Sequence, residues 1–83
     1  MYSIDFYVYI HYTKDTKEIF YVGKGINNRA YSKVKRNKFW WNIVNKHDYC
    51  LKILYSNLSE EKAFLLEKEL IKNLKAIGLA KAN

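Results

Sequence analysis

The 83-residue chain contains a single cysteine, Cys50. One cysteine cannot form an internal disulfide and cannot build a cysteine-based zinc site. The fold must therefore be held together by side-chain packing, which suits a reducing compartment. A chain of this length permits one domain, spanning 1–83, and buries only about 60% of the surface that its unfolded form exposes, so we expect a small core.

Long apolar segments are also missing. No stretch approaches the ~18 consecutive apolar residues that a transmembrane helix requires. The first five residues, Met-Tyr-Ser-Ile-Asp, lack the basic segment followed by an apolar run that marks a signal peptide. We therefore expect a cytoplasmic domain that has no membrane partner.

Acidic residues are absent from the middle of the chain, between Glu18 and Asp48. The same interval holds seven cations and is interleaved with aromatic residues, whereas basic and acidic residues are equal in number outside it. The net charge of +7 therefore belongs to this segment: Lys24, Arg29, Lys33, Lys35, Arg36, Lys38 and Lys46. Such a segment predicts a polyanionic partner, because each Lys or Arg that meets a phosphate releases counterions.

The positive charge of this segment does not identify a partner by itself. A solvated helix face in a lysine-rich proteome would give the same composition, and charge alone does not distinguish DNA from RNA or from an anionic membrane.

The order of hydrophobic patterns predicts an α+β domain with elements in the order ββααβα. We expect strands over 4–12, 18–23 and 49–56, and helices over 29–35, 38–47 and 60–77. Gly23-Lys24-Gly25 is expected to interrupt the chain after the second strand. Ser59 is a suitable N-cap for the last helix, and Gly78 is a suitable residue to end it.

The first strand has two distinct faces, because side chains alternate along a strand. One face is apolar and carries Ile4, Phe6, Val8 and Ile10. The other carries polar aromatic side chains: Tyr7, Tyr9 and His11.

The last helix places a carboxylate among apolar residues. At 100° per residue, Glu67 falls within the arc formed by Phe64, Leu66, Leu70, Ile71, Leu74 and Ile77. An unpaired buried carboxylate is costly, so Glu67 is neutral, paired, or facing a cleft where a cation binds. The pairing alternative is an internal ion pair with Arg29 or a lysine. A single hard oxygen ligand, completed by water and phosphate, suits Mg²⁺ better than Zn²⁺.

Several motifs together resemble the GIY-YIG nuclease family, in particular its phage and homing-endonuclease branch. They are Tyr7-Val8-Tyr9, Phe20-Tyr21-Val22-Gly23-Lys24-Gly25, Asn28-Arg29-Ala30-Tyr31, Arg36-Asn37-Lys38-Phe39-Trp40 and the later Glu67. The resemblance covers nearly the whole chain. It implies a small three-stranded antiparallel sheet flanked by helices.

The resemblance also implies a role for each matching residue. Tyr9 would accept a proton from the attacking water, and Tyr21 would line the site and contact the phosphate or its water. Arg29 would hold the scissile phosphate, and Glu67 would be the protein ligand of one Mg²⁺ or Mn²⁺ ion. Gly23 would let the backbone turn beside the substrate, and Asn83 would match a late asparagine of the family.

Physical arguments add accessory candidates to this set. A phenol is a weak base at neutral pH, so we expect a nearby cation such as Lys24, or the metal, to lower the pKa of a catalytic tyrosine. His11 shares a strand face with Tyr9 and is a candidate assistant. Lys33 stands where relatives often carry a histidine; it could hold a phosphate but would shuttle a proton poorly.

These motifs predict a divalent-metal-dependent endonuclease that hydrolyses DNA phosphodiester bonds. The nucleic acid would contact Lys24, Arg29, Lys33, Lys35, Arg36 and Lys38. Family members commonly continue into a further DNA-binding module, and this chain is expected to act as a monomer or weak homodimer in a bacterial or phage-infected cell. Two alternatives remain open: an inactive nucleic-acid-binding module with the same fold, and an RNA substrate.

Overall fold

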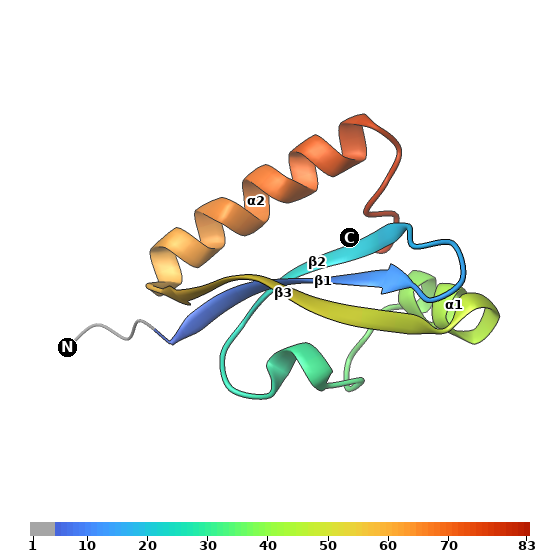
Figure 1. The fold of residues 1–83 in the computed structure, drawn as a ribbon, viewed down its shortest axis with the longest axis horizontal. Helices are drawn as coiled ribbons and strands as arrows, with labels where there is room; N and C mark the ends of the chain where they lie inside the picture. Colours follow the sequence, from blue (N-terminus) through green and yellow to red (C-terminus); the bar gives the residue numbers. More distant parts are fainter. Residues whose placement is uncertain (1–4) are drawn as a thin grey trace.

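The computed structural model describes residues 5–83, which form a three-stranded sheet flanked by helices (Figure 1). The predicted α+β class and the antiparallel sheet are confirmed. The elements in chain order are β1 (Phe6–Thr13), β2 (Ile19–Gly25), the 3₁₀ helix η1 (Arg29–Tyr31), α1 (Lys38–His47), β3 (Tyr49–Leu58) and α2 (Glu60–Ala76). The predicted start of the first strand at Ile4 lies outside the described residues.

The sheet has the order β2-β1-β3, so β1 is the central strand and pairs antiparallel with both neighbours. Tyr9 lies opposite Gly23 on one side and Ile53 on the other. As the alternation of β1 predicts, its two faces differ. Helix α2 covers one face, while the segment that contains η1 lies on the opposite side (Figure 1).

The core between α2 and the sheet is small, as the chain length predicts. Val8, Ile10, Val22 and Ala63 form its buried centre. Two residues expected on the inner arc of α2 are instead exposed: Phe64 retains 48% of its surface and Ile77 retains 72%. Because Ala63 is fully buried, the helix approaches the sheet closely at that small side chain and turns Phe64 outward.

A second cluster lies on the other side of the sheet, where α1 meets β2. Trp40 is fully buried there with Phe20 and Ala82. Both helices begin at a side-chain N-cap, of which only Ser59 was predicted. The Asn37 side chain accepts a hydrogen bond from the Trp40 N–H at 2.9 Å, and the Ser59 hydroxyl accepts one from the Lys62 N–H at 3.2 Å.

The free edge of β2 is covered by the last residues of the chain. The Ala80 and Ala82 N–H groups donate to the carbonyls of Ile19 and Phe20 at 3.1 and 2.9 Å. The Asn83 side chain then makes two hydrogen bonds of 2.8 Å with the backbone N–H and C=O of Val22. This segment satisfies backbone groups that an open sheet edge would leave unpaired.

Two predicted boundaries are wrong. The strand β2 continues through Gly25 and is not interrupted at Gly23, because the two glycines lie under the rings of Tyr9 and Tyr7 and leave room for them. The predicted helix over 29–35 is only a 3₁₀ turn at Arg29–Tyr31, after which the backbone becomes extended at Ser32. Within residues 5–83, no helix is long and apolar enough to cross a membrane.

The contact between Gly23 and Tyr9 can be tested by adding one methyl group. A Cβ at Gly23 would collide with the ring of Tyr9 at Cζ, so the ring or the strand must move. We expect Gly23→Ala to lower the free energy of unfolding by about 1–3 kcal/mol, the usual cost of overpacking. Urea unfolding followed by near-UV circular dichroism measures this change.

The matched control removes the ring. In a Tyr9→Ala background, Gly23→Ala should cost much less than in the wild type, giving a clear coupling energy in the double-mutant cycle. Equal costs in the two backgrounds would mean that the ring does not occupy the space above Gly23.

Candidate active site

Four aromatic side chains gather on the face of the sheet opposite α2. Tyr7, Tyr9 and His11 come from β1, and Tyr21 comes from β2. The ring centroids of Tyr9 and Tyr21 are 6.2 Å apart, and His11 stacks on Tyr21 at 5.5 Å. The two tyrosines that the motifs single out therefore lie side by side.

Tyr7 and His11 on this face also hold the segment that follows β2. They do so through hydrogen bonds to the backbone of Ala30, which is fully buried. The Tyr7 hydroxyl accepts the Ala30 N–H at 2.9 Å and donates to the Asn27 carbonyl at 2.7 Å. The His11 Nε2 lies 3.0 Å from the Ala30 carbonyl oxygen. We call this arrangement the Ala30 clamp: Tyr7 and His11 hold both backbone polar groups of Ala30, and so fix the position of Arg29 beside it.

His11 is a neutral member of the clamp. The Trp40 indole N–H donates to its Nδ1 at 2.9 Å, so Nδ1 is unprotonated and the proton lies on Nε2, which donates to Ala30. Burial lowers the pKa of His11 to about 4. Because both ring nitrogens are occupied, the geometry favours a positioning role over the predicted assistance in proton transfer.

Tyr9 is almost entirely covered, with 1% of its surface exposed. Its hydroxyl oxygen accepts a hydrogen bond from Nη1 of Arg36 at 3.2 Å. Burial raises the pKa of the Tyr9 phenol above its ordinary value, although the hydrogen bond from Arg36 and the charges of Arg36 and Arg29 oppose this effect. In this structure Tyr9 is therefore a phenol at neutral pH.

The expectation that Lys24 lowers the pKa of Tyr9 is wrong. The Lys24 side chain lies on the α2 side of the sheet, where its amine is 3.7 Å from Oε2 of Glu60 and 5.8 Å from the ring centre of Phe64. The cations that act on Tyr9 are Arg36 and Arg29. Alternation along β2 explains the difference, because Lys24 follows Gly23 and points to the opposite face.

Tyr21 and Arg29 carry polar groups that the protein leaves available. Among residues 5–83, the hydroxyl of Tyr21 makes no hydrogen bond to the protein, and the exposed Arg29 guanidinium has no carboxylate within 4.0 Å. Both groups are free to contact a ligand. A phosphate matches this pair because a guanidinium can bind two of its oxygens at once.

Glu67 reaches the backbone of β2 from α2. It is half-buried, and its Oε2 accepts the Lys24 N–H at 2.7 Å. The alternative of an ion pair with Arg29 or a lysine is not observed for Glu67 within the described part of the chain. One carboxylate oxygen is thus fixed by a neutral donor, and among residues 5–83 the charge has no cationic partner.

Tyr9 and Glu67 both contact the backbone at Gly23 and Lys24. The ring of Tyr9 lies over Gly23, and Glu67 binds the N–H of the next residue. Because Val22 and Lys24 are two residues apart, their N–H groups point to the same free edge of β2, where Asn83 and Glu67 bind them. A groove of about 410 Å³ at the end of β2 is lined by Phe6, Lys24, Gly25, Ile26, Arg29 and Glu60; of the four predicted catalytic residues, only Arg29 lines it.

The donor set fits a hard divalent cation. Residues 5–83 contain no group of three or more His, Cys, Asp or Glu side chains that could hold a metal by themselves. An ion at Glu67 would therefore take most of its ligands from water and substrate oxygens. Mg²⁺ commonly binds in this way, through one or two carboxylates and the phosphates of the substrate.

The remaining predicted contacts lie outside this centre. Lys33, Lys35 and Lys38 are exposed, and the Lys33 amine lies 5.9 Å from the ring centre of Tyr49. Asn83 supports the backbone of β2 through its side chain, at Val22 between Tyr21 and Gly23.

The contact between Arg36 and Tyr9 was not predicted from the sequence. We expected Arg36 only as one of several nucleic-acid contacts, yet it touches Tyr9, a residue 27 positions earlier. Tyr7 and Trp40 were also missed as supporting residues. The only signal for them was their place in the motifs, because the contacts depend on how the segment from Asn27 to Asn37 folds back onto the sheet.

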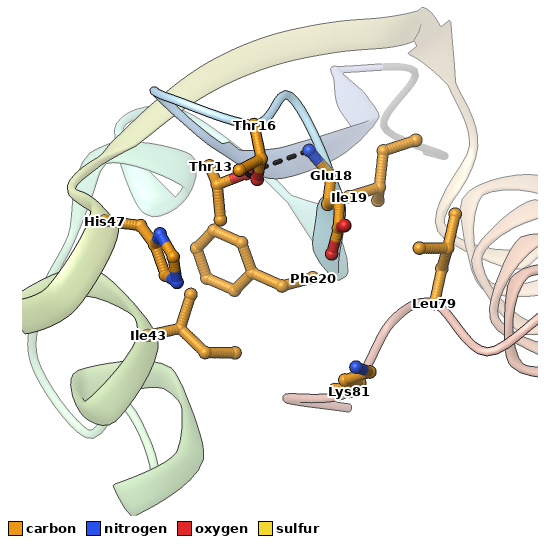
Figure 2. Close-up of a pocket in the computed structure, with 9 residues that line it drawn as sticks. All are labelled: Thr13, Thr16, Glu18, Ile19, Phe20, Ile43, His47, Leu79 and Lys81. Atoms are coloured by element: carbon orange, nitrogen blue, oxygen red, sulfur yellow. Dashed lines mark hydrogen bonds between the residues drawn. The ribbon is translucent and has the colours of Figure 1, made fainter.

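A separate cavity of about 240 Å³ lies near the β1–β2 loop (Figure 2). Phe20 and Ile43 form its apolar wall, and His47 stands at one side. The His47 Nδ1 lies 2.8 Å from Oδ2 of Asp15, and this hydrogen bond lowers the pKa of the Asp15 carboxyl. No predicted catalytic residue lines this cavity.

Comparison of the chain with protein-family models, curated proteins and solved structures gives no match. The resemblance to GIY-YIG nucleases therefore stays a prediction from the motifs.

The clamp predicts a specific pH dependence of stability. The pKa of folded His11 is about 4, below its ordinary value of 6.5, so the unfolded chain binds a proton first as the pH falls. Stability is fully present above pH 6.5 and decreases towards pH 4. We expect the free energy of unfolding to fall by roughly 2 kcal/mol between pH 7 and pH 5.

Urea unfolding at both pH values, followed by tryptophan fluorescence, measures this loss. His11→Gln should remove most of the difference, whereas His47→Gln should retain it because that histidine is partly exposed. A wild-type stability that is equal at the two pH values would contradict a buried neutral His11.

Proposed function

We propose that this chain is a divalent-metal-dependent endonuclease that hydrolyses DNA phosphodiester bonds. The observation that carries the proposal is that the rings of Tyr9 and Tyr21 lie side by side and the Arg29 charge acts on Tyr9, while Glu67 binds the N–H of Lys24, next to the glycine that the Tyr9 ring covers. The four residues come from four elements: β1, β2, η1 and α2. Such a grouping of two phenols, a guanidinium and a carboxylate suits hydrolysis of a phosphate ester.

Unneutralised positive charge supports a phosphate substrate. The Arg29 and Arg36 guanidinium groups have no carboxylate partner within residues 5–83, and exposed lysines continue the positive surface along Lys33, Lys35 and Lys38. Exposed aromatic side chains, Tyr31 and Phe39, lie in the same segment. This combination is typical of surfaces that follow a nucleic-acid backbone.

The proposed chemistry is a direct hydrolysis. A water oxygen forms a bond to phosphorus as the ester bond to the leaving oxygen breaks, which yields a phosphomonoester and a hydroxyl group. The oxygen of Tyr9, once deprotonated, takes the proton of the water, and the leaving oxygen takes one from solvent. Arg29 binds the phosphate and stabilises the additional charge of the transition state.

Glu67 would hold the divalent ion. When bound, the ion supplies Lewis-acid stabilisation of negative charge on the phosphate oxygens. The Lys24 N–H fixes one carboxylate oxygen of Glu67 and so orients the other. The Tyr21 hydroxyl, which has no protein partner within the described residues, would orient the water or a phosphate oxygen.

One observation favours the second candidate, a nucleic-acid-binding module without turnover. The Tyr9 hydroxyl is covered and burial raises its pKa, so it is poorly prepared to act as a base before substrate binds. Such a module would bind nucleic acid in a salt-sensitive way without metal-dependent cleavage.

The direct test is Glu67→Gln with Glu69→Gln as its matched control, since Glu69 lies on the exposed side of the same helix. We expect Glu67→Gln to lower Mg²⁺-dependent nicking of supercoiled plasmid by at least about 100-fold, because it removes the carboxylate that would hold the ion. DNA binding in EDTA should be retained by both variants, and Glu69→Gln should cleave at the wild-type rate.

Parallel assays on duplex DNA, single-stranded DNA and RNA identify the substrate. Binding without cleavage by the wild-type chain, in either Mg²⁺ or Mn²⁺, would favour the binding module. Cleavage by Glu67→Gln at the wild-type rate would contradict the assignment of the metal ligand.

A further inference from the structure

The Arg36 side chain uses all three of its nitrogens inside the candidate site. Nε donates to the Ser32 carbonyl at 2.9 Å, and Nη2 donates to the Arg29 carbonyl at 3.3 Å. Nη1 donates to the Tyr9 hydroxyl oxygen at 3.2 Å. Two bonds thus anchor the guanidinium to the segment that the Ala30 clamp holds, and the third reaches the tyrosine.

Aromatic rings surround the same guanidinium. Its carbon lies 5.0 Å from the ring centre of Tyr21, 5.9 Å from that of Tyr9 and 5.7 Å from that of Trp40. Arg36 is half-buried, and no carboxylate of residues 5–83 lies within 4.0 Å of it. A positive charge in these surroundings is incompletely compensated, and the nearest group that can become an anion is the Tyr9 phenol.

The hydrogen bond has one direction only. A guanidinium carries five N–H donors and no acceptor, so it cannot take the Tyr9 proton. The Tyr9 oxygen must accept from Arg36, and its own proton must point elsewhere. The donor of this bond is already a cation, so the bond becomes a pair of opposite charges when that proton leaves and is strengthened further.

We propose that Arg36 is a positioning residue that orients the Tyr9 oxygen and compensates its negative charge when it is deprotonated. This inference rests on the proposed function, in which Tyr9 accepts the proton of the attacking water. It assigns to Arg36 a task different from that proposed for the exposed lysines around it, which would contact only the nucleic-acid backbone.

The electrostatics of the folded chain agree with this task. The hydrogen bond and the charge of Arg36 are the two largest effects that lower the pKa of Tyr9 against the burial that raises it. Arg29 contributes less, and its guanidinium is exposed. Removing Arg36 should therefore make Tyr9 harder to ionise, whether or not DNA is present.

The first experiment needs no enzymatic activity. Tyrosines labelled with ¹³C at Cζ are titrated by NMR in the wild type, Arg36→Gln, Arg36→Lys and the control Lys38→Gln, with Tyr9→Phe used to assign the Tyr9 signal. We expect Arg36→Gln to move the Tyr9 midpoint up by about one pH unit or more. Arg36→Lys should move it less, and Lys38→Gln should not move it.

The second experiment measures cleavage as a function of pH. Arg36→Gln should lower kcat by roughly 10- to 100-fold at neutral pH, the size of a proton-transfer contribution, and should shift the rising limb of the profile to higher pH. Lys38→Gln should weaken binding through KM and leave that limb unchanged. Near-UV circular dichroism checks that each variant is folded; if Arg36→Gln is not, Arg36→Lys provides both readouts.

The outcomes separate the two proposals. An unchanged Tyr9 midpoint in the folded Arg36 variants, or losses of kcat equal to those of Lys38→Gln, would overturn the role of Arg36 even if the chain is a nuclease. A wild-type chain that does not cleave, but in which Arg36→Gln shifts Tyr9, would contradict the proposed function and support the coupling between Arg36 and Tyr9.

Discussion

The candidate site depends on the Ala30 clamp. A loop of irregular backbone has few interactions of its own to fix it, and here two side chains of the central strand supply them. Tyr7 holds the N–H of Ala30 and His11 holds its carbonyl, while Trp40 keeps His11 in the required tautomer. Both backbone polar groups of a fully buried residue are hydrogen-bonded, and breaking either bond would leave a buried group unpaired at a cost in folding free energy. The sheet thereby positions Arg29. Arg36 adds hydrogen bonds to the carbonyls of Arg29 and Ser32 in the same segment.

Close packing on β2 is the second constraint. Gly23 and Gly25 lie where any side chain would collide with the rings of Tyr9 and Tyr7. The two glycines of β2 therefore make room for the large rings of Tyr9 and Tyr7 on β1. The outer edge of β2 is in turn capped by Glu67 and Asn83, so its backbone connects the aromatic face to α2 and to the end of the chain.

Local patterns predicted the features that local physics controls. Alternation in β1 identified both of its faces, apolar spacing predicted α1, and Ser59 identified the start of α2. The patterns failed where distant contacts decide the outcome. They ended β2 at Gly23, because a glycine pair usually marks a turn and the rings above it cannot be seen in the sequence. They also placed Arg36 on a general basic surface, since nothing local shows that it folds back onto Tyr9. Only the motif resemblance selected Tyr9, Tyr21, Arg29 and Glu67 as a set; the structure places Tyr9 beside Tyr21 and ties Glu67 to the backbone at Lys24.

Amide hydrogen exchange at Ala30 tests the clamp most directly, because that N–H has a single acceptor, the hydroxyl of Tyr7. In the wild type we expect Ala30 to exchange slowly, at a rate comparable with the central residues of β1. Tyr7→Phe removes the acceptor and keeps the ring, so exchange at Ala30 should accelerate by at least about tenfold, the equivalent of one lost hydrogen bond, while Val8 and Val22 remain protected. Rapid exchange at Ala30 in the wild type, or no change in Tyr7→Phe, would contradict the account.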